Sequence, residues 1–299
     1  MSPLDLFLLV VLGAIWGASF LFIRIGAPAL GPVPLVELRL VLAAAALLAY
    51  AAVRRDTVLR PERWRQFLMQ GTVNNVVPFV TIASAELFIT AGLGAILNAT
   101  TPFFTVIVNS VWHRRRPSFG QILGTIVGFL GVVALVGLGS LDLGRGVFLG
   151  VVLSLVGAFS YGIAAVYASR TFRDLRPIEV SVNQLVISGI LLAPVAVATR
   201  TGADARPDVI VSVLSLALLG TAVGYLIYFR LIQSAGPTRA STVTLLIPPF
   251  GVFFGSVVLG EPIGPGLVAG LALILVGVAL VYGWVRAPRL SFRAAPTSD

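Results

Sequence analysis

The chain has 299 residues, of which 58% are apolar and only 11% charged, and its mean hydropathy is +1.00. Soluble domains average roughly 45–50% apolar and about 25% charged residues, so this chain has too few charges to cover a water-soluble globule. It contains no cysteine, no lysine and one histidine, which excludes disulfide frameworks, thiol nucleophiles, Schiff-base lysines and histidine-rich metal sites. We therefore expect a polytopic membrane protein with no metal and no cofactor.

Proline, glycine and arginine divide the chain into ten apolar runs, each about the 20 residues that cross a bilayer as a helix. Unbroken runs favour helices over the alternating strands of a barrel. The first run follows no basic segment and precedes no small-residue cleavage site, so it is predicted to be a membrane helix rather than a cleaved signal. The predicted spans are 4–27, 34–53, 66–88, 93–112, 118–138, 146–169, 177–199, 208–232, 238–259 and 265–285.

The arginines predict how these helices are oriented. With both termini in the cytoplasm, 16 of the 21 arginines lie in inner loops or the C-terminal tail, and three lie in outer loops. The positive-inside rule therefore predicts that both termini are cytoplasmic. We expect the protein in the inner membrane of a bacterial cell. It also explains the net charge of +9 without nucleic-acid binding.

Short sequence patterns recur about 144 residues apart. Ala91-Gly92 recurs as Ala235-Gly236, and the glycine pair at 124 and 131 recurs at 270 and 277. The sequence thus predicts an all-α fold of two five-helix repeats, at 1–140 and 141–287, followed by a cytoplasmic tail at 288–299. Because five is odd, the second repeat enters the membrane from the opposite side, and such inverted repeats are common in secondary transporters.

Polar, aromatic and proline residues inside the predicted spans are candidate substrate ligands, because they are costly in lipid and tend to face the protein interior. Amide, hydroxyl and aromatic groups suit a zwitterionic ligand with an apolar side chain. Pro102 in the fourth span and Pro248 in the ninth occupy matching places in the two halves, and interrupted helices at such equivalent positions point to a transporter's binding site. The alternatives are interhelical hydrogen bonds and tolerated kinks. The candidates are Trp16, Ser19, Asn74, Pro78, Thr81, Asn98, Thr101, Pro102, Ser160, Tyr161, Tyr225, Tyr228 and Pro248.

Few charges lie inside the predicted spans. Arg24, Glu37 and Arg39 fall near the outer ends of the first two helices, where we expect pairing or snorkelling. Glu86, near the outer end of the third span, is the candidate for proton coupling. No carboxylate lies at a predicted midplane, so facilitated or loosely coupled exchange stays open.

Several stretches together resemble the EamA domain of the drug/metabolite transporter superfamily. They are Trp16-Gly17-Ala18-Ser19-Phe20, Arg39, and a run from Gly220 to Leu280 that holds Tyr225, Ala235-Gly236-Pro237-Thr238-Arg239-Ala240, Leu246-Ile247-Pro248, Leu259-Gly260-Glu261 and Gly270. In overall likeness the chain is most similar to the YddG-type exporters of aromatic and other amino acids. It departs from the family pattern where the first half has His113-Arg114-Arg115-Arg116 in place of Leu-Gly-Glu.

The resemblance implies a secondary transporter that exports amino acids, including aromatic ones, and related small metabolites by alternating access. Efflux of other drugs or metabolites, or flipping of a lipid-linked molecule, are the alternatives. No catalytic motif or channel-type charged ring is found, so we expect neither an enzyme nor a channel. The expected partners are a small-molecule substrate and membrane lipid. A monomer fits the sequence, but its glycine stripes leave the oligomeric state open.

Overall fold

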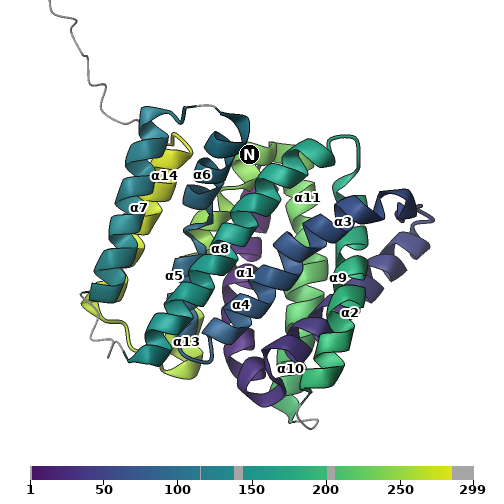
Figure 1. Cartoon of the computed structure of the whole chain (residues 1–299), viewed down its shortest axis with the longest axis horizontal. Coiled ribbons are helices and arrows are strands. Elements are labelled where there is room, and N and C mark those ends of the chain that lie inside the picture. The colour runs from purple at the N-terminus through teal and green to yellow at the C-terminus, as the bar shows by residue number, and fades with distance from the viewer. Residues whose placement is uncertain (1, 115, 138–143, 201–205, 285–299) are drawn as a thin grey trace, which may run out of the picture.

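The structure is a computed structural model that describes residues 2–114, 116–137, 144–200 and 206–284. Within these ranges it is a bundle of helices without strands (Figure 1). The predicted tail at 288–299 lies outside the described residues. In the part of the chain that the structure describes, seven helices are long and apolar enough to cross a membrane, and two shorter apolar helices follow at Val243–Leu259 and Pro265–Val281.

The helices follow the predicted apolar runs closely. Those of the first half are α1 (Pro3–Leu30), α2 (Pro32–Val53), η1 (Pro61–Arg63), α3 (Trp64–Gly71), η2 (Thr72–Val76), α4 (Val77–Ala85), α5 (Ala91–Asn98), α6 (Thr101–His113) and α7 (Phe119–Gly137). Those of the second half are α8 (Arg145–Thr171), α9 (Pro177–Thr199), α10 (Pro207–Leu214), η3 (Ser215–Val223), α11 (Gly224–Ala235), α12 (Pro237–Ala240), α13 (Val243–Leu259) and α14 (Pro265–Val281). The third predicted span corresponds to a helix from Trp64 to Ala85, which is not among the seven.

Local sequence signals set where several helices begin. Ser2 and Asp5 form a reciprocal capping box at the start of α1, in which the Asp5 N–H donates to Ser2 Oγ at 3.1 Å. Proline opens α2, α9, α10 and α14, where its missing N–H costs no hydrogen bond. Gly31 separates α1 from α2 at a φ of +83°, which L side chains rarely adopt, so the tight reversal there requires glycine.

Backbone irregularities occur in the third and eighth predicted spans, and again in the fourth and ninth, which are equivalent spans of the two halves. The π-helical segment η2 joins α3 to α4, and the π-helical segment η3 joins α10 to α11. The fourth span is broken at residues 99–100, just before Pro102, whose ring and missing N–H oppose a continuous helix. The interruption that we expected at Pro248 is wrong, because α13 runs through it as one helix and the break lies earlier, at residues 241–242.

The packing between helices repeats when the two halves are exchanged. The helix α1 packs on α13 as α8 packs on α6, and α1 packs on α10 and α11 as α8 packs on α4. Three further contacts pair equivalent helices with each other, namely α2 with α9, α5 with α13, and α7 with α14. A two-fold relation between the halves would produce this pattern. The inverted ten-helix repeat and the orientation of the termini stay predictions.

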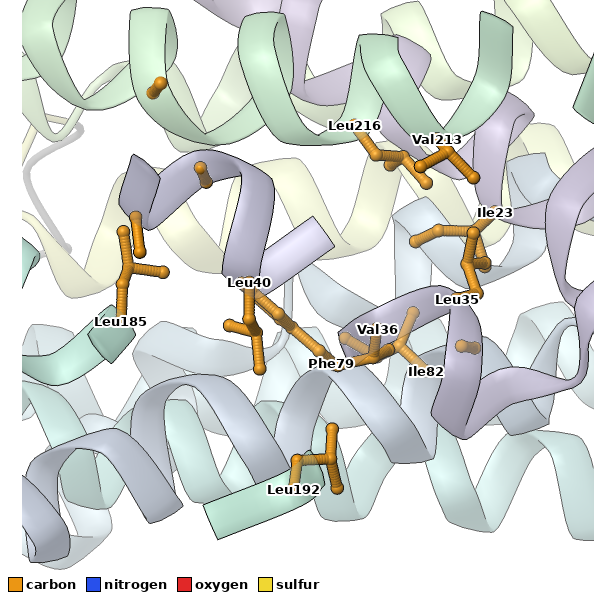
Figure 2. Packing of buried hydrophobic residues seen from close by; sticks show 14 of the residues in the cluster. Ile23, Leu35, Val36, Leu40, Phe79, Ile82, Leu185, Leu192, Val213 and Leu216 are labelled. Atoms are coloured by element: carbon orange, nitrogen blue, oxygen red, sulfur yellow. The ribbon is translucent and has the colours of Figure 1, made fainter. Parts of the chain in front are cut away.

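The largest hydrophobic cluster joins helices from both halves. Figure 2 shows side chains of α1, α2 and α4 meeting those of α9, α10 and η3. The labelled members are Ile23, Leu35, Val36, Leu40, Phe79, Ile82, Leu185, Leu192, Val213 and Leu216. The cluster holds α2 against both halves, and this position brings the polar residue Arg39 of α2 into the protein interior.

The helices α7 and α14 form the most extensive pair in the molecule and lie side by side at one end of the bundle (Figure 1). Their contact depends on glycine. A Cβ added to Gly277 would lie 2.6 Å from the Gly124 carbonyl oxygen and 2.8 Å from the Gly128 nitrogen. Both neighbours are backbone atoms that cannot rotate away. The two helices can therefore approach to van der Waals distance only because these positions carry no side chain.

We expect Gly277→Ala to destabilise the protein by about 1–3 kcal/mol, the usual cost of overpacking a fixed contact. The matched control is Gly137→Ala at the end of α7, where an added Cβ meets nothing within 4 Å. Thermal unfolding of both variants in detergent measures the effect. Equal melting temperatures for the two variants would show that the α7–α14 contact is not glycine-dependent.

Candidate functional site

A cluster of polar and aromatic side chains lies between the two halves, and we call it the central cluster. It comprises Arg39 of α2, Asn74 of η2, Tyr161 of α8, Thr221 of η3 and Tyr225 of α11. Arg39 is only 8% exposed. Its Nε donates to Thr221 Oγ1 at 2.9 Å.

Aromatic rings form the walls of the central cluster. The Arg39 guanidinium carbon lies 3.9 Å from the centroid of the Phe79 ring, a cation–π contact. Phe79 in turn meets Tyr161 edge-on, with 6.4 Å between ring centroids. Tyr161 and Tyr225 both interact electrostatically with Arg39, and Tyr225 also interacts with the Asn74 side chain. Residues from four helical elements therefore surround one guanidinium.

The two π-helical segments accept side-chain hydrogen bonds on their backbone. Trp16 Nε1 donates to the Gly220 carbonyl oxygen of η3 at 3.0 Å. Ser160 Oγ donates to the Val73 carbonyl oxygen of η2 at 2.7 Å. A π turn changes the backbone pairing and is frequent at functional sites. Here it places side chains of η2 and η3 in the central cluster while neighbouring helices hydrogen-bond its carbonyls.

An amide and hydroxyl chain extends from the central cluster to α9. Asn74 Nδ2 lies 3.3 Å from Gln184 Oε1, and Asn75 Nδ2 donates to Ser188 Oγ at 3.2 Å. Our sequence prediction missed Gln184 and Ser188, although both are polar residues inside an apolar run. That position was the signal that identified the other candidates.

The structure brings together several of the predicted substrate ligands. Asn74, Tyr161 and Tyr225 belong to the central cluster, and Trp16 hydrogen-bonds the residue that precedes Thr221. The ring of Tyr228 lies 5.4 Å from that of Trp16. Three other candidates adjoin these: Ser19, buried near Gly220; Ser160 of α8, which hydrogen-bonds η2; and Pro78, next to Phe79.

The remaining candidates lie elsewhere. Thr81 faces Gly157 of α8. Asn98, Thr101 and Pro102 lie at the break between α5 and α6, where the Thr101 hydroxyl donates to the Asn98 carbonyl oxygen at 2.8 Å. Pro248 is buried in α13, the helix that packs on α1.

The expectation that Arg39 pairs with a carboxylate or snorkels is wrong. No ion pair to Arg39 exists among the described residues, and its burial rules out snorkelling. It lies seven residues inside α2, which is about 10 Å along a helix and too deep for the surface. Arg24 behaves more nearly as expected, because its Nη1 donates to the backbone carbonyl of Glu86.

A second polar site contains two carboxylates. Glu86 is fully buried, and neither of its carboxylate oxygens has a hydrogen-bond partner. Glu261, between α13 and α14, accepts hydrogen bonds from the backbone N–H groups of Ala91 at 2.7 Å and Gly92 at 3.0 Å. Glu261 therefore caps α5 from the other half of the chain. Glu261 and Arg24 are the charged groups that act electrostatically on Glu86.

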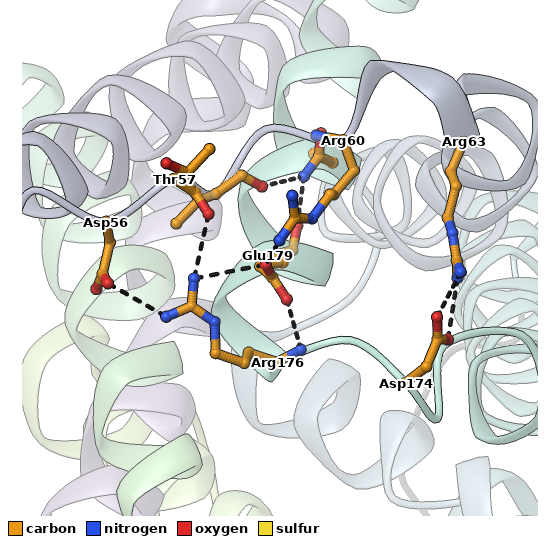
Figure 3. Close-up of polar contacts among 9 residues, drawn as sticks. Asp56, Thr57, Arg60, Arg63, Asp174, Arg176 and Glu179 are labelled. Carbon is orange, nitrogen blue, oxygen red and sulfur yellow. Dashed lines mark hydrogen bonds and ion pairs between the residues drawn. The ribbon is translucent and has the colours of Figure 1, made fainter.

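A network of ion pairs joins the α2–α3 connection to the α8–α9 connection (Figure 3). Arg60 Nη2 lies 2.5 Å from Glu179 Oε1, and Arg176 Nη1 lies 3.2 Å from Asp56 Oδ1. Arg63 pairs with Asp174 through both carboxylate oxygens. We call these contacts the loop network, and they connect the first half of the chain to the second.

The loop network changes the acidity of its exposed members. The hydrogen bond from Arg63 holds the pKa of the Asp174 carboxyl below its usual value. The same bond raises the pKa of Arg63, and the hydrogen bond to Asp56 raises that of Arg176. A carboxyl with a lowered folded-state pKa loses its stabilising contribution as the pH falls through that pKa. The loop network therefore weakens only in acid and is intact at neutral pH.

Among the described residues, no three acidic or histidine side chains are grouped to hold a metal ion.

The sequence matches the model of the EamA-like transporter family twice, over residues 4–137 and 148–283. An "uncharacterized transporter" of Archaeoglobus fulgidus is 24% identical over 89% of this chain and 94% of its own. A "probable amino-acid metabolite efflux pump" of Salmonella typhimurium is 26% identical over 95% of this chain and 97% of its own. The "uncharacterized inner membrane transporter YedA" of Escherichia coli is 26% identical over 91% of this chain and 89% of its own. A solved crystal structure with 16% identity superposes with a TM-score of 0.67 over 94% of this chain and 96% of its own, which shows a shared fold.

We expect Glu179→Gln to destabilise the protein by about 1.5–3 kcal/mol, the range for hydrogen bonds to charged groups. Its side chain is 3% exposed and binds both Arg60 and Arg176 at the start of α9. The control is Asp174→Asn, in which the lost ion pair is exposed and the change in melting temperature is smaller. Thermal unfolding in detergent compares them. A larger loss for Asp174→Asn would contradict this ranking.

Proposed function

The chain belongs to the EamA-like transporter family of the drug/metabolite transporter superfamily, and from this membership we propose that it exports amino acids, including aromatic ones, and related small metabolites. The proposed route is alternating access across a bacterial inner membrane, as in the YddG-type exporters. The family and the relatives' names indicate a transporter rather than an enzyme. The name of the Salmonella relative supports the amino-acid cargo.

The observation that carries the proposal is the composition of the central cluster. It offers one cation, two phenol hydroxyls and an amide beside aromatic walls, all between the halves. An amino acid is a zwitterion that needs hydrogen-bond donors and acceptors at one end and, when its side chain is apolar, an apolar surface at the other.

We also propose the topology that alternating access needs, with ten spans, two inverted repeats at 1–140 and 141–287, and both termini in the cytoplasm. The exchange of helix contacts between the halves and the two separate family matches support the repeat. The distribution of arginines supports the orientation, because the loop network then lies on the cytoplasmic side.

The orientation is testable because the chain contains no cysteine, so each introduced cysteine is the only one. In intact cells, a membrane-impermeant maleimide is expected to label Gly264→Cys, before α14, and to leave Ser118→Cys, before α7, unlabelled. Permeabilised cells are expected to label both variants. Labelling of Ser118→Cys alone in intact cells would show that the protein has the opposite orientation.

We expect purified protein in proteoliposomes to take up labelled phenylalanine or other neutral amino acids saturably. Tyr225→Phe removes the hydroxyl that interacts with Asn74 and Arg39, so it is expected to lower kcat/KM several-fold, up to about tenfold. The matched control is Tyr50→Phe, which removes the hydroxyl of an exposed tyrosine on α2 and is expected to change nothing. If folded protein transports no amino acid, the cargo proposal fails, and other metabolites or lipids are tested next.

We propose Glu86 as the residue that couples transport to protons. Its buried oxygens lack partners, and it lies near the second carboxylate, Glu261. Binding a proton would remove both the cost of burying an unpaired charge and the repulsion between the two carboxylates. With a pH gradient across the liposome, Glu86→Gln is expected to abolish the gradient-driven part of uptake while exchange without a gradient persists. The control is Glu62→Gln, which removes an exposed carboxylate of η1 and is expected to leave the gradient-driven uptake unchanged. Uptake by the unmodified protein that ignores the gradient would establish facilitated exchange instead.

A further inference from the structure

We propose that Arg39 binds the carboxylate of the transported molecule, so that the protein selects substrates by their carboxylate. This inference deepens the proposed function and rests on the protein being a transporter of small molecules. It assigns the substrate's charged end to one residue, and it predicts that carboxylic acids are accepted while the corresponding amines are not.

The first observation is an unbalanced charge. Arg39 is buried, and no carboxylate of the described residues lies within 4 Å of its guanidinium. The ionisable groups that face it are the phenols of Tyr161 and Tyr225, which are neutral at physiological pH. Buried charges in proteins are normally paired. In the loop network, by contrast, Arg60, Arg63 and Arg176 each have a carboxylate partner.

The second observation is the geometry of the donors. Arg39 uses only Nε, and its two Nη groups donate to no other described residue. The guanidinium is nevertheless held in place. Its hydrogen-bond acceptor, the Thr221 hydroxyl, itself donates to the Leu216 carbonyl oxygen at 2.9 Å, and the Phe79 ring covers one face. A fixed planar fork with free Nη groups matches a carboxylate, which it binds through two parallel hydrogen bonds.

The third observation is the position between the halves. Arg39 and Phe79 come from the first half, whereas Tyr161, Thr221 and Tyr225 come from the second. Arg39 interacts electrostatically with both phenols and hydrogen-bonds Thr221, so a carboxylate on Arg39 would sit among groups of both halves. The ring walls beside it suit an apolar side chain. These features favour an aromatic or aliphatic carboxylic acid over a cationic drug.

The test begins with the wild-type protein in proteoliposomes and three labelled probes of similar shape. L-phenylalanine carries both charged groups, 3-phenylpropionate carries only the carboxylate, and phenethylamine carries only the amine. We expect uptake of L-phenylalanine and inhibition of that uptake by 3-phenylpropionate, with neither uptake of nor inhibition by phenethylamine. Uptake of phenethylamine at the rate of L-phenylalanine would overturn the proposal.

The variants are Arg39→Gln and Arg39→Lys. We expect Arg39→Gln to weaken the apparent affinity for L-phenylalanine by about 10- to 100-fold, because a hydrogen bond to a charged group is lost. Arg39→Lys keeps the charge but loses the fork, so its loss is intermediate. The matched control is Arg54→Gln, at the exposed end of the same helix, and it is expected to match wild type. Unchanged affinity in Arg39→Gln would overturn the proposal.

The outcomes separate this inference from the proposed function. Uptake of L-phenylalanine that is unaffected by Arg39→Gln keeps the amino-acid exporter and removes the role of Arg39. Uptake of 3-phenylpropionate without L-phenylalanine, lost in Arg39→Gln, keeps the role of Arg39 and removes the amino-acid cargo. Uptake of none of the probes by folded wild type rejects both. If Arg39→Gln does not fold, thermal stabilisation of wild type by 3-phenylpropionate but not by phenethylamine supports the proposal, and the reverse overturns it.

Discussion

Backbone polar groups of a membrane-spanning chain must be hydrogen-bonded within the protein, and this constraint determines where the chain can carry irregular backbone. The π-helical segments η2 and η3 both pack against other helices on one side. Trp16 and Ser160 donate to their carbonyls, so the irregular turns are stabilised by neighbouring helices. The same turns carry Asn74 and Thr221 into the central cluster. The polar site therefore depends on irregular backbone whose carbonyl groups are hydrogen-bonded by neighbouring helices.

The α7–α14 pair and the helices around Arg39 differ in the kind of contact that holds them together. The helices α7 and α14 meet through glycines and contribute no residue to the central cluster. Their contact leaves no space for a side chain to rearrange, so it suits a rigid support. The helices around Arg39 meet through hydrogen bonds and ring contacts, which can be exchanged for bonds to a ligand or water at modest cost.

The sequence predicted the helices and part of the site for different reasons. Apolar runs and Pro102 depend on local physics, so the spans and the break in the fourth one followed directly. Tyr161 and Tyr225 were found because polar groups inside spans tend to face inward. Arg39 was misjudged because distance from the helix end alone cannot show which neighbours surround a side chain. The π-helical segments depend on tertiary hydrogen bonds, and no pattern in the sequence signals them.

Both ends of the interface between the halves are bridged in this structure. Arg60 binds Glu179 at one end, and Glu261 caps α5 at the other. Under alternating access these bridges must open in turn, and a substrate can shift such an equilibrium only by its difference in affinity for the two states. Each bridge must therefore cost no more than a few kcal/mol to break. The exposed pairs Arg63–Asp174 and Arg176–Asp56 meet this requirement because water rehydrates them on opening. The buried Arg39 lacks this compensation and needs an anion.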